Sequence, residues 1–244
     1  MDVTLLVTIL IVIFALTFDF INGFHDTANS IATSVSTKAL KPRQAVLLAA
    51  TMNFVGAMTF TGVAQTITKD IVDPFTLANG SVVILAALTA AIAWNLITWY
   101  YGIPSSSSHA LIGSIAGAAI ASAGFQSLNY SGFLKIIEAL IFSPIIAFIA
   151  GFIIYSIFKV IFRNNNLTKT NRNFRYFQII TASLQAYTHG TNDAQKAMGI
   201  ITMALIANNY WTTTEIPFWV QFSCALAIGL GTSAGGWRII KTVG

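Results

Sequence analysis

Long apolar runs alternate with short polar connections along the chain. The apolar runs lie near 3–21, 44–66, 81–101, 106–124, 136–161, 176–206 and 217–237. About 20 mainly apolar residues are enough for a helix to cross a hydrocarbon core of roughly 30 Å. The pattern therefore predicts an all-α integral membrane protein with about seven transmembrane crossings.

Two apolar regions are too long for one straight span. The first extends from Val3 to Val35 and contains Asn22–Gly23, and the second extends from Phe177 to Ala207 and contains Gly190. Glycine weakens a helix by about 1 kcal/mol relative to alanine, and asparagine competes for backbone hydrogen bonds. We therefore expect broken or re-entrant helices, with the first break at Asn22–Gly23 and a similar one at Gly190.

The polar residues inside these two long regions form a repeated motif. Asn22–Ser30 is the first copy, and Thr188–Gly199 is the second, with Asp26 aligned on Asp193. An acid at mid-membrane costs about 2.5–3.5 kcal/mol on the insertion scale and is usually functional. Five predicted crossings separate the two copies, so they should face opposite ways, as in transporters built from inverted repeats. We interpret the copies as two halves of one site.

A cluster of serines follows the third apolar run. Pro104–His109 reads Pro-Ser-Ser-Ser-Ser-His and precedes a run of small residues. Proline and serine mark a helix start, and free N–H groups beside hydroxyls suit an anion. A second copy of this cluster, at the same distance from Gly190, would fall beyond Gly244. We therefore expect a first repeat over 1–162, a cytoplasmic basic linker over 163–175 and an incomplete second repeat over 176–244.

Charged residues are few, and most of the basic ones fall on one side of the predicted membrane. Only 9% of the residues are charged, against about 25% in soluble domains. The net charge is +5. With the N-terminus placed outside, ten of the 13 lysines and arginines fall on the same side of the membrane. The positive-inside rule makes that side cytoplasmic. This distribution excludes nucleic acid as a partner. It predicts a multi-pass protein of the cell membrane whose partner is the lipid bilayer, and the small-residue helix faces make a homo-oligomer plausible.

The repeated motif supplies candidate cation ligands. The carboxylates of Asp26 and Asp193 could bind sodium together with the amides of Asn22, Asn29 and Asn192, or hold a proton. If the ion is sodium, its ligands are expected from Asp26, Asn29, Asn192 and Asp193. The alternative is that the two acids only cap helix ends.

Hydroxyl and cationic groups supply candidate anion ligands. The hydroxyls of Ser105–Ser108 and of Thr27 could donate to an anion, although serines also pack between helices. Lys196 could attract the anion or pair with Asp193 three residues earlier. The chain's three histidines, at 25, 109 and 189, all adjoin these motifs. They could relay protons or donate to the anion, or only form hydrogen bonds between helices.

On these motifs the chain resembles the Pit-type inorganic phosphate transporters, a family with duplicated Gly-x-Asn-Asp signatures. The resemblance covers roughly residues 15–240 and rests on Gly23–Ser30, His189–Lys196 and Pro104–His109 together. It implies symport of phosphate with a monovalent cation, sodium or proton, by alternating access, with no cofactor. His25 stands where many members have asparagine, which leaves the coupling ion open.

The resemblance assigns the candidate residues to two roles. The phosphate ligands would be Thr27, Ser105, Ser106, Ser107, Ser108, His109, Thr191 and Lys196. The cation ligands, for sodium or a proton, would be Asn22, His25, Asp26, Asn29, Asn192 and Asp193.

Two other functions use the same residue types. A membrane-embedded hydrolase could use Ser105–Ser108, His109 and Asp26, but the chain has neither a Gly-x-Ser-x-Gly elbow nor a His-Glu-x-x-His helix. A passive anion channel would need no paired acids. We therefore predict a secondary active transporter and not an enzyme.

Overall fold

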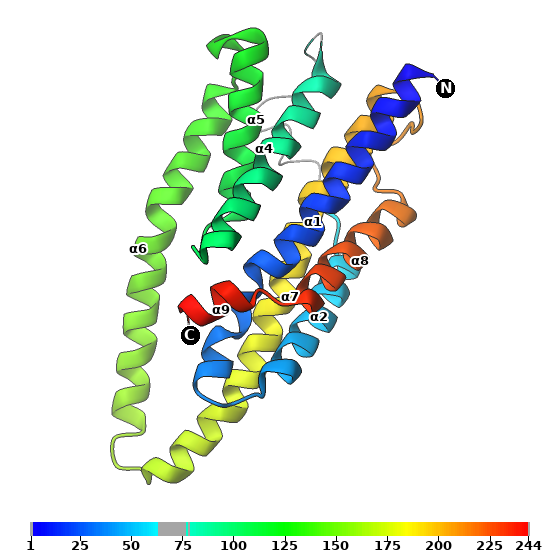
Figure 1. The fold of residues 1–244 in the computed structure, drawn as a ribbon. Helices are drawn as coiled ribbons and strands as arrows, with labels where there is room; N and C mark the ends of the chain where they lie inside the picture. Colours follow the sequence, from blue (N-terminus) through cyan, green and yellow to red (C-terminus); the bar gives the residue numbers. More distant parts are fainter. Residues whose placement is uncertain (1, 63–76, 78, 244) are drawn as a thin grey trace.

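The computed structural model describes residues 2–62, 77 and 79–243, apart from the side chain of Thr27. All the regular elements in these ranges are helices (Figure 1). They are α1 (Val3–Ser36), α2 (Pro42–Thr59), α4 (Gly80–Tyr101), α5 (Ser107–Ala123), the short 3-10 helix η2 (Phe125–Ser127), α6 (Tyr130–Ile161), α7 (Leu167–Ala207), α8 (Phe218–Ala234) and α9 (Trp237–Val243). The all-α prediction is confirmed.

Both copies of the repeated motif lie within unbroken helices. Helix α1 continues for 34 residues through Asn22–Gly23, and α7 continues for 41 residues through Gly190. The predicted breaks at these positions are therefore wrong. At about 1.5 Å per residue, α1 is about 50 Å long, so it exceeds a hydrocarbon core of roughly 30 Å without needing a break.

The two glycines allow close helix packing. A Cβ atom on Gly23 would collide with the carbonyl oxygen of Ile228 in α8, and one on Gly190 would collide with the backbone of Asn53 in α2. Close backbone approach through small residues is typical of membrane helix packing. The glycines therefore bring α1 onto α8 and α7 onto α2.

A second pair of glycines completes these two helix contacts. Gly231 of α8 meets the carbonyl oxygen of Phe20 in α1, and Gly56 of α2 meets the carbonyl oxygen of Tyr187 in α7. Phe20 and Tyr187 each lie three residues before the glycine of their own motif. The pair α1–α8 thus has the same arrangement of contacts as the pair α7–α2.

Helices α1 and α7 lie side by side in opposite directions (Figure 1). Along α1, Thr8 contacts Asn208, Asn22 contacts Asp193 and Thr37 contacts Gln178, each through a side-chain hydrogen bond. Residue numbers thus rise along one helix as they fall along the other. This orientation is consistent with the predicted inverted repeat.

The chain bends away from a helical path at other positions. Helices α8 and α9 meet at an angle of 64° around Gly235–Gly236, and Gly235 has a φ of +73°, which favours glycine. Residues 102–106 separate α4 from α5, and the Ser106 side chain caps α5 by accepting a hydrogen bond from the His109 amide at 3.3 Å. The helix start predicted at the serine cluster is confirmed.

Several helices have the length and composition of membrane spans. Among the described residues, α1, α4 and α6 each qualify alone, and α8 with α9 would make a fourth, bent span; α5 is a shorter apolar helix. Helix α6 has only one buried residue, Gly132, so its apolar side chains face outward. Helix α7 begins at Leu167, inside the predicted linker.

Candidate functional site

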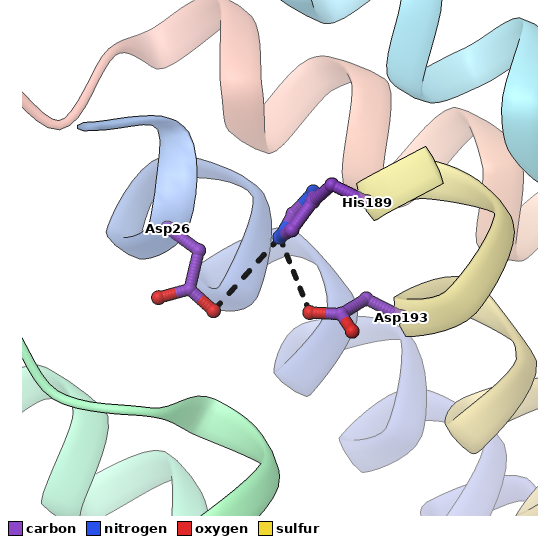
Figure 2. A group of neighbouring side chains, drawn as sticks. All are labelled: Asp26, His189 and Asp193. Atoms are coloured by element: carbon purple, nitrogen blue, oxygen red, sulfur yellow. Dashed lines mark ion pairs between the residues drawn. The ribbon is translucent and has the colours of Figure 1, made fainter. Parts of the chain in front are cut away.

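The two aspartates of the repeated motif meet where α1 and α7 cross the middle of the bundle. The Asn22 side-chain amide donates to Asp193 Oδ2 at 3.0 Å. His189 Nε2 lies 3.1 Å from Asp193 Oδ2 and 3.9 Å from Asp26 Oδ2, so the imidazole stands between the two acids (Figure 2). The structure thus brings both halves of the motif into one cluster.

The hydrogen bonds of His189 fix its orientation. Its Nδ1 lies 3.0 Å from Asn53 Oδ1, and the Asn53 amide nitrogen donates to Thr232 Oγ1 at 2.8 Å. The carbonyl oxygen of Asn53 therefore faces the ring, and Nδ1 carries a hydrogen. Nε2 therefore faces Asp26 and Asp193. The space between these two acids and Nε2 suits a positive charge, either a proton on Nε2 or a bound cation.

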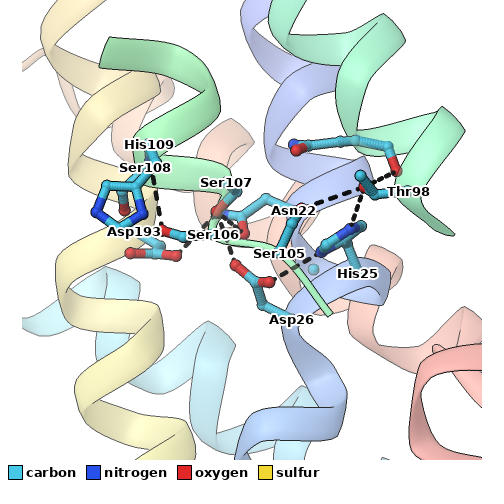
Figure 3. Close-up of polar contacts among 12 residues, drawn as sticks. Asn22, His25, Asp26, Thr98, Ser105, Ser106, Ser107, Ser108, His109 and Asp193 are labelled. Atoms are coloured by element: carbon cyan, nitrogen blue, oxygen red, sulfur yellow. Dashed lines mark hydrogen bonds and ion pairs between the residues drawn. The ribbon is translucent and has the colours of Figure 1, made fainter. Parts of the chain in front are cut away.

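The serine cluster contacts Asp26 directly and reaches Asp193 through Asn22 and Lys196. Ser107 Oγ lies 2.7 Å from Asn22 Oδ1 and 2.7 Å from Asp26 Oδ2, and its one hydrogen serves these two acceptors (Figure 3). Ser108 Oγ accepts from Lys196 Nζ at 2.5 Å. The start of α5 is thereby attached to α1 on one side and to α7 on the other.

Lys196 forms the ion pair expected for residues three apart on a helix. Its Nζ lies 2.7 Å from Asp193 Oδ1, and both side chains are largely buried. The pairing with Asp193 and the contact with Ser108 occur together, so the ammonium group also lies beside the hydroxyls. Two carboxylates thus face one ammonium, and the cluster has net negative charge whenever His189 is neutral.

A cavity of about 400 Å³ opens onto this cluster. Its lining residues are Asp26, Asn29, Pro104, Ser105, Ser106, Ser108, His189 and Asp193. A larger cavity of about 720 Å³ lies between the end of α6 and the start of α7, but its walls are mostly aromatic and amide side chains such as Phe158 and Asn173. The smaller cavity has the ionisable groups and hydroxyls that ion binding requires.

Some predicted site residues lie away from this cavity. His25 is buried against α4, with Nδ1 3.0 Å from Asp26 Oδ1 and Nε2 2.9 Å from Thr98 Oγ1. His109 lines a separate depression of about 440 Å³ together with Trp94. His25 does not line the cavity and is connected to it through Asp26 and Thr98.

Two further candidates on α7 also point elsewhere. The Thr191 hydroxyl lies 2.9 Å from the carbonyl oxygen of Tyr187 and 3.2 Å from that of Gly56, facing α2. Asn192 is exposed and does not line the cavity. Successive side chains on a helix point about 100° apart, so Asn192 points away from the direction of Asp193. The side chain of Thr27 lies outside the part of the chain that is described.

The sequence interpretation missed several polar residues that support the site. Asn53 and Thr232 form the hydrogen-bonded chain behind His189, which ends at the carbonyl oxygen of Gly23, 3.2 Å from Thr232 Oγ1. Thr98 lies between His25 and Ser105, whose Oγ is 3.2 Å from Thr98 Oγ1. Asn53, Thr98 and Thr232 are buried polar residues in mainly apolar helices, and a buried polar side chain needs a partner.

Comparison with known proteins decides the family. Residues 22–244 match the model of the phosphate transporter family. The chain belongs to the phosphate transporter family. The match includes both copies of the aspartate motif and the serine cluster, so the resemblance seen in the sequence is confirmed.

Named phosphate transporters match most or all of the chain. A probable low-affinity inorganic phosphate transporter of Bacillus subtilis (strain 168) is 78% identical over all of this chain, which covers 74% of that protein. The low-affinity inorganic phosphate transporter PitA of Escherichia coli (strain K12) is 33% identical over 82% of this chain and 46% of its own length. The chain therefore spans about three quarters of the length of the Bacillus subtilis relative.

A solved structure has the same fold. The structure of a sodium-dependent phosphate transporter matches 97% of this chain and 77% of its own chain, with a TM-score of 0.80 and 24% sequence identity. The phosphate transporter family is a family of multi-pass membrane transporters, so the prediction of a transporter rather than an enzyme is confirmed. Among the described residues of the site, the Ser107 hydroxyl donates to Asp26 and Asn22, and neither contact favours the hydrolase alternative.

Proposed function

We propose that this chain moves inorganic phosphate across the cell membrane together with a monovalent cation, by alternating access. The observation that supports this best is the combination of charges around the cavity. Asp26 and Asp193 place two carboxylates where the anion must enter, and Lys196 offsets one of them. A phosphate anion would be repelled unless a positive charge enters with it, which is the requirement of a symporter.

The cation would bind between the two aspartates. Ligand atoms of Asp26, His189 and Asp193 all lie within 4.8 Å of one another. A sodium ion could take the carboxylate oxygens as ligands, and a proton could take His189 Nε2 or a carboxylate oxygen. Asn29 lines the same cavity and is a further oxygen ligand for a metal ion.

Phosphate would bind beside the start of α5. Ser105, Ser106 and Ser108 line the cavity and offer hydroxyl donors. The Lys196 ammonium, already at Ser108, adds a charged donor. Because these donors lie close to Asp193, the bound phosphate and the bound cation would interact directly.

The two halves of the transporter would be residues 1–162 and 176–244, joined by 163–175. The opposite directions of α1 and α7 and the matching glycine contacts of α1–α8 and α7–α2 support this division. By the positive-inside argument the N-terminus would lie outside and the basic connections in the cytoplasm. Alternating access would then move one pair of helices against the other.

Phosphate uptake into proteoliposomes tests the proposal. The purified chain is compared with Asp26→Asn and Asp193→Asn under imposed sodium or proton gradients, and Asp2→Asn, at the exposed start of α1, is the control. We expect gradient-driven uptake by the parent and the control, and loss of uptake in both site variants. Uptake that continues at the parental rate in Asp26→Asn and Asp193→Asn would refute the assignment.

A further inference from the structure

A third membrane carboxyl, Asp19, lies behind the site and has no part in the function proposed above. It lies on α1, three residues before Asn22 and seven before Asp26, so the three side chains follow one face of the helix. The Asp19 side chain is fully buried. Asp19 is therefore about one helical turn from Asn22 and about two from Asp26.

The two carboxyl oxygens of Asp19 are unusual in this bundle. Neither accepts a hydrogen bond from a nitrogen or oxygen donor within the described part of the chain. By contrast, Asp26 and Asp193 each have partners at 3.1 Å or less, from Ser107 and Lys196 among others. A buried polar group that lacks partners has a specific reason to be there more often than not.

The groups that face Asp19 come from α7 and α8. Lys196, Asp193 and His189 of α7 interact with it electrostatically, and the Cys224 thiol of α8 is a weak donor to it. The Lys196 ammonium is committed to Asp193 Oδ1 and Ser108 Oγ. Helix α4 also packs on α1 but has no titratable side chain before Tyr100.

These surroundings suit a neutral carboxyl. An isolated carboxylate in an apolar interior is strongly unfavourable, whereas the protonated acid avoids that cost. A metal ion at this position would need several oxygen ligands, and a thiol is a poor substitute for them. A proton needs only the carboxyl group itself.

We propose that Asp19 carries a coupling proton of this transporter in addition to the cation held between Asp26 and Asp193. Asp19 is protonated in the conformation seen here and is emptied when α1 shifts against α7 and α8. This inference rests on the transport function proposed above. Release breaks the carboxyl O–H bond, passes the proton to water and leaves a carboxylate. The Lys196 ammonium could then act as the counter-charge for the Asp19 carboxylate, because phosphate or a cation bound at the site would change the contact between Lys196 and Asp193.

Asn22 connects this carboxyl to the site. It lies between Asp19 and Asp26 on the same helix face and bonds both Asp193 and Ser107. A ligand that separates Asp193 from Asn22 would therefore loosen α1 from α7 next to Asp19. Proton release would follow from that movement.

Infrared spectroscopy of the purified chain tests the protonation state without any transport. A protonated carboxyl has a C=O stretching band that a carboxylate lacks. We expect such a band in the parent, its loss in Asp19→Asn and a shifted band in Asp19→Glu. A spectrum unchanged by Asp19→Asn would overturn the proposal.

Transport assays in proteoliposomes test the coupling. Asp19→Asn is expected to exchange phosphate across the membrane at equal pH like the parent, but to lose accumulation driven by a pH gradient. Asp19→Glu should keep that accumulation, and Thr202→Val, which removes another buried unpartnered oxygen on α7, should behave as the parent. Proton-driven accumulation by Asp19→Asn, or a parent driven by sodium alone, would overturn the proposal. A parent that exchanges no phosphate would instead refute the transport function, while the infrared result would still report on Asp19.

Discussion

Replacing Lys196 with methionine should destabilise the protein substantially, because it leaves a buried carboxylate without its counter-charge. The Lys196 and Asp193 side chains are only 8% and 13% exposed, and their charged atoms are 2.7 Å apart. Removing one partner of a buried ion pair costs about 3–5 kcal/mol. Asp193 keeps its contacts with Asn22 and His189, and hydrogen bonds to a charged group contribute about 1.5–3 kcal/mol each. We therefore expect a loss at the lower end, about 3 kcal/mol of unfolding free energy.

A double-mutant cycle separates this effect from lost packing. Adding Asp193→Asn to Lys196→Met removes the uncompensated charge, so the double variant should be more stable than Lys196→Met alone. Groups in direct contact typically show interaction energies of about 0.5–3 kcal/mol in such cycles. The measurement is denaturant unfolding of the purified chain in detergent micelles, followed by tryptophan fluorescence.

The control for this cycle is Lys169→Met, an exposed lysine on the same helix. A surface change of this kind should stay within about 0.5 kcal/mol of the parent. If Lys196→Met is as mild as this control, or if the two site substitutions add without interaction, Asp193 does not depend on Lys196 and the reasoning is wrong.

Two further predictions concern helix packing. Gly190→Ala should lower the unfolding free energy by about 1–3 kcal/mol, because the added Cβ would meet the Asn53 backbone. The control is Gly113→Ala on α5, which should be neutral or stabilising because the added Cβ enters open space. Equal melting temperatures for these two alanine variants would contradict the close contact. Arg238→Ala should lower the thermal stability by about 1 kcal/mol, since the guanidinium lies 4.8 Å from the Trp99 ring centroid. Its melting curve is compared with that of Arg238→Lys, which should retain part of the effect, and an unchanged curve for Arg238→Ala would show that the contact adds no stability.

The apolar pattern alone predicted where most helices lie. The predicted run 81–101 became α4, Gly80–Tyr101, and 106–124 became α5, Ser107–Ala123. Hydropathy works well here because each run must satisfy its own backbone hydrogen bonds in lipid, and a helix does so within one segment. Polar helix ends are harder to predict, and α7 starts at Leu167, nine residues before the predicted run at 176.

The breaks predicted in the motif helices failed for a physical reason. A glycine next to asparagine can weaken a helix, or it can let another backbone approach, and the local sequence is the same in both cases. At Gly23 the neighbour is Ile228, far away in the chain, so tertiary contact decides the outcome. The helix bend lies at Gly235–Gly236, where no motif drew attention to it.

The cluster of candidate site residues was predictable in part. Duplication of the motif indicated that Asp26 and Asp193 would meet, and the structure places both beside His189. The sequence could not show which neighbours on each helix face the cavity, because Thr191 and Asn192 flank Asp193 at different helix rotations. Their roles in binding remain predictions.

Phosphate binding measured as a function of cation concentration shows whether phosphate and the cation bind to the site together. Binding of radiolabelled phosphate to the purified chain is measured over a series of sodium concentrations at fixed pH, and over a series of pH values without sodium. We expect phosphate affinity to rise steeply with the concentration of one of the two cations, and Asp193→Asn to weaken this dependence. Phosphate affinity that is the same at every sodium concentration and every pH would contradict a binding site in which anion and cation enter together.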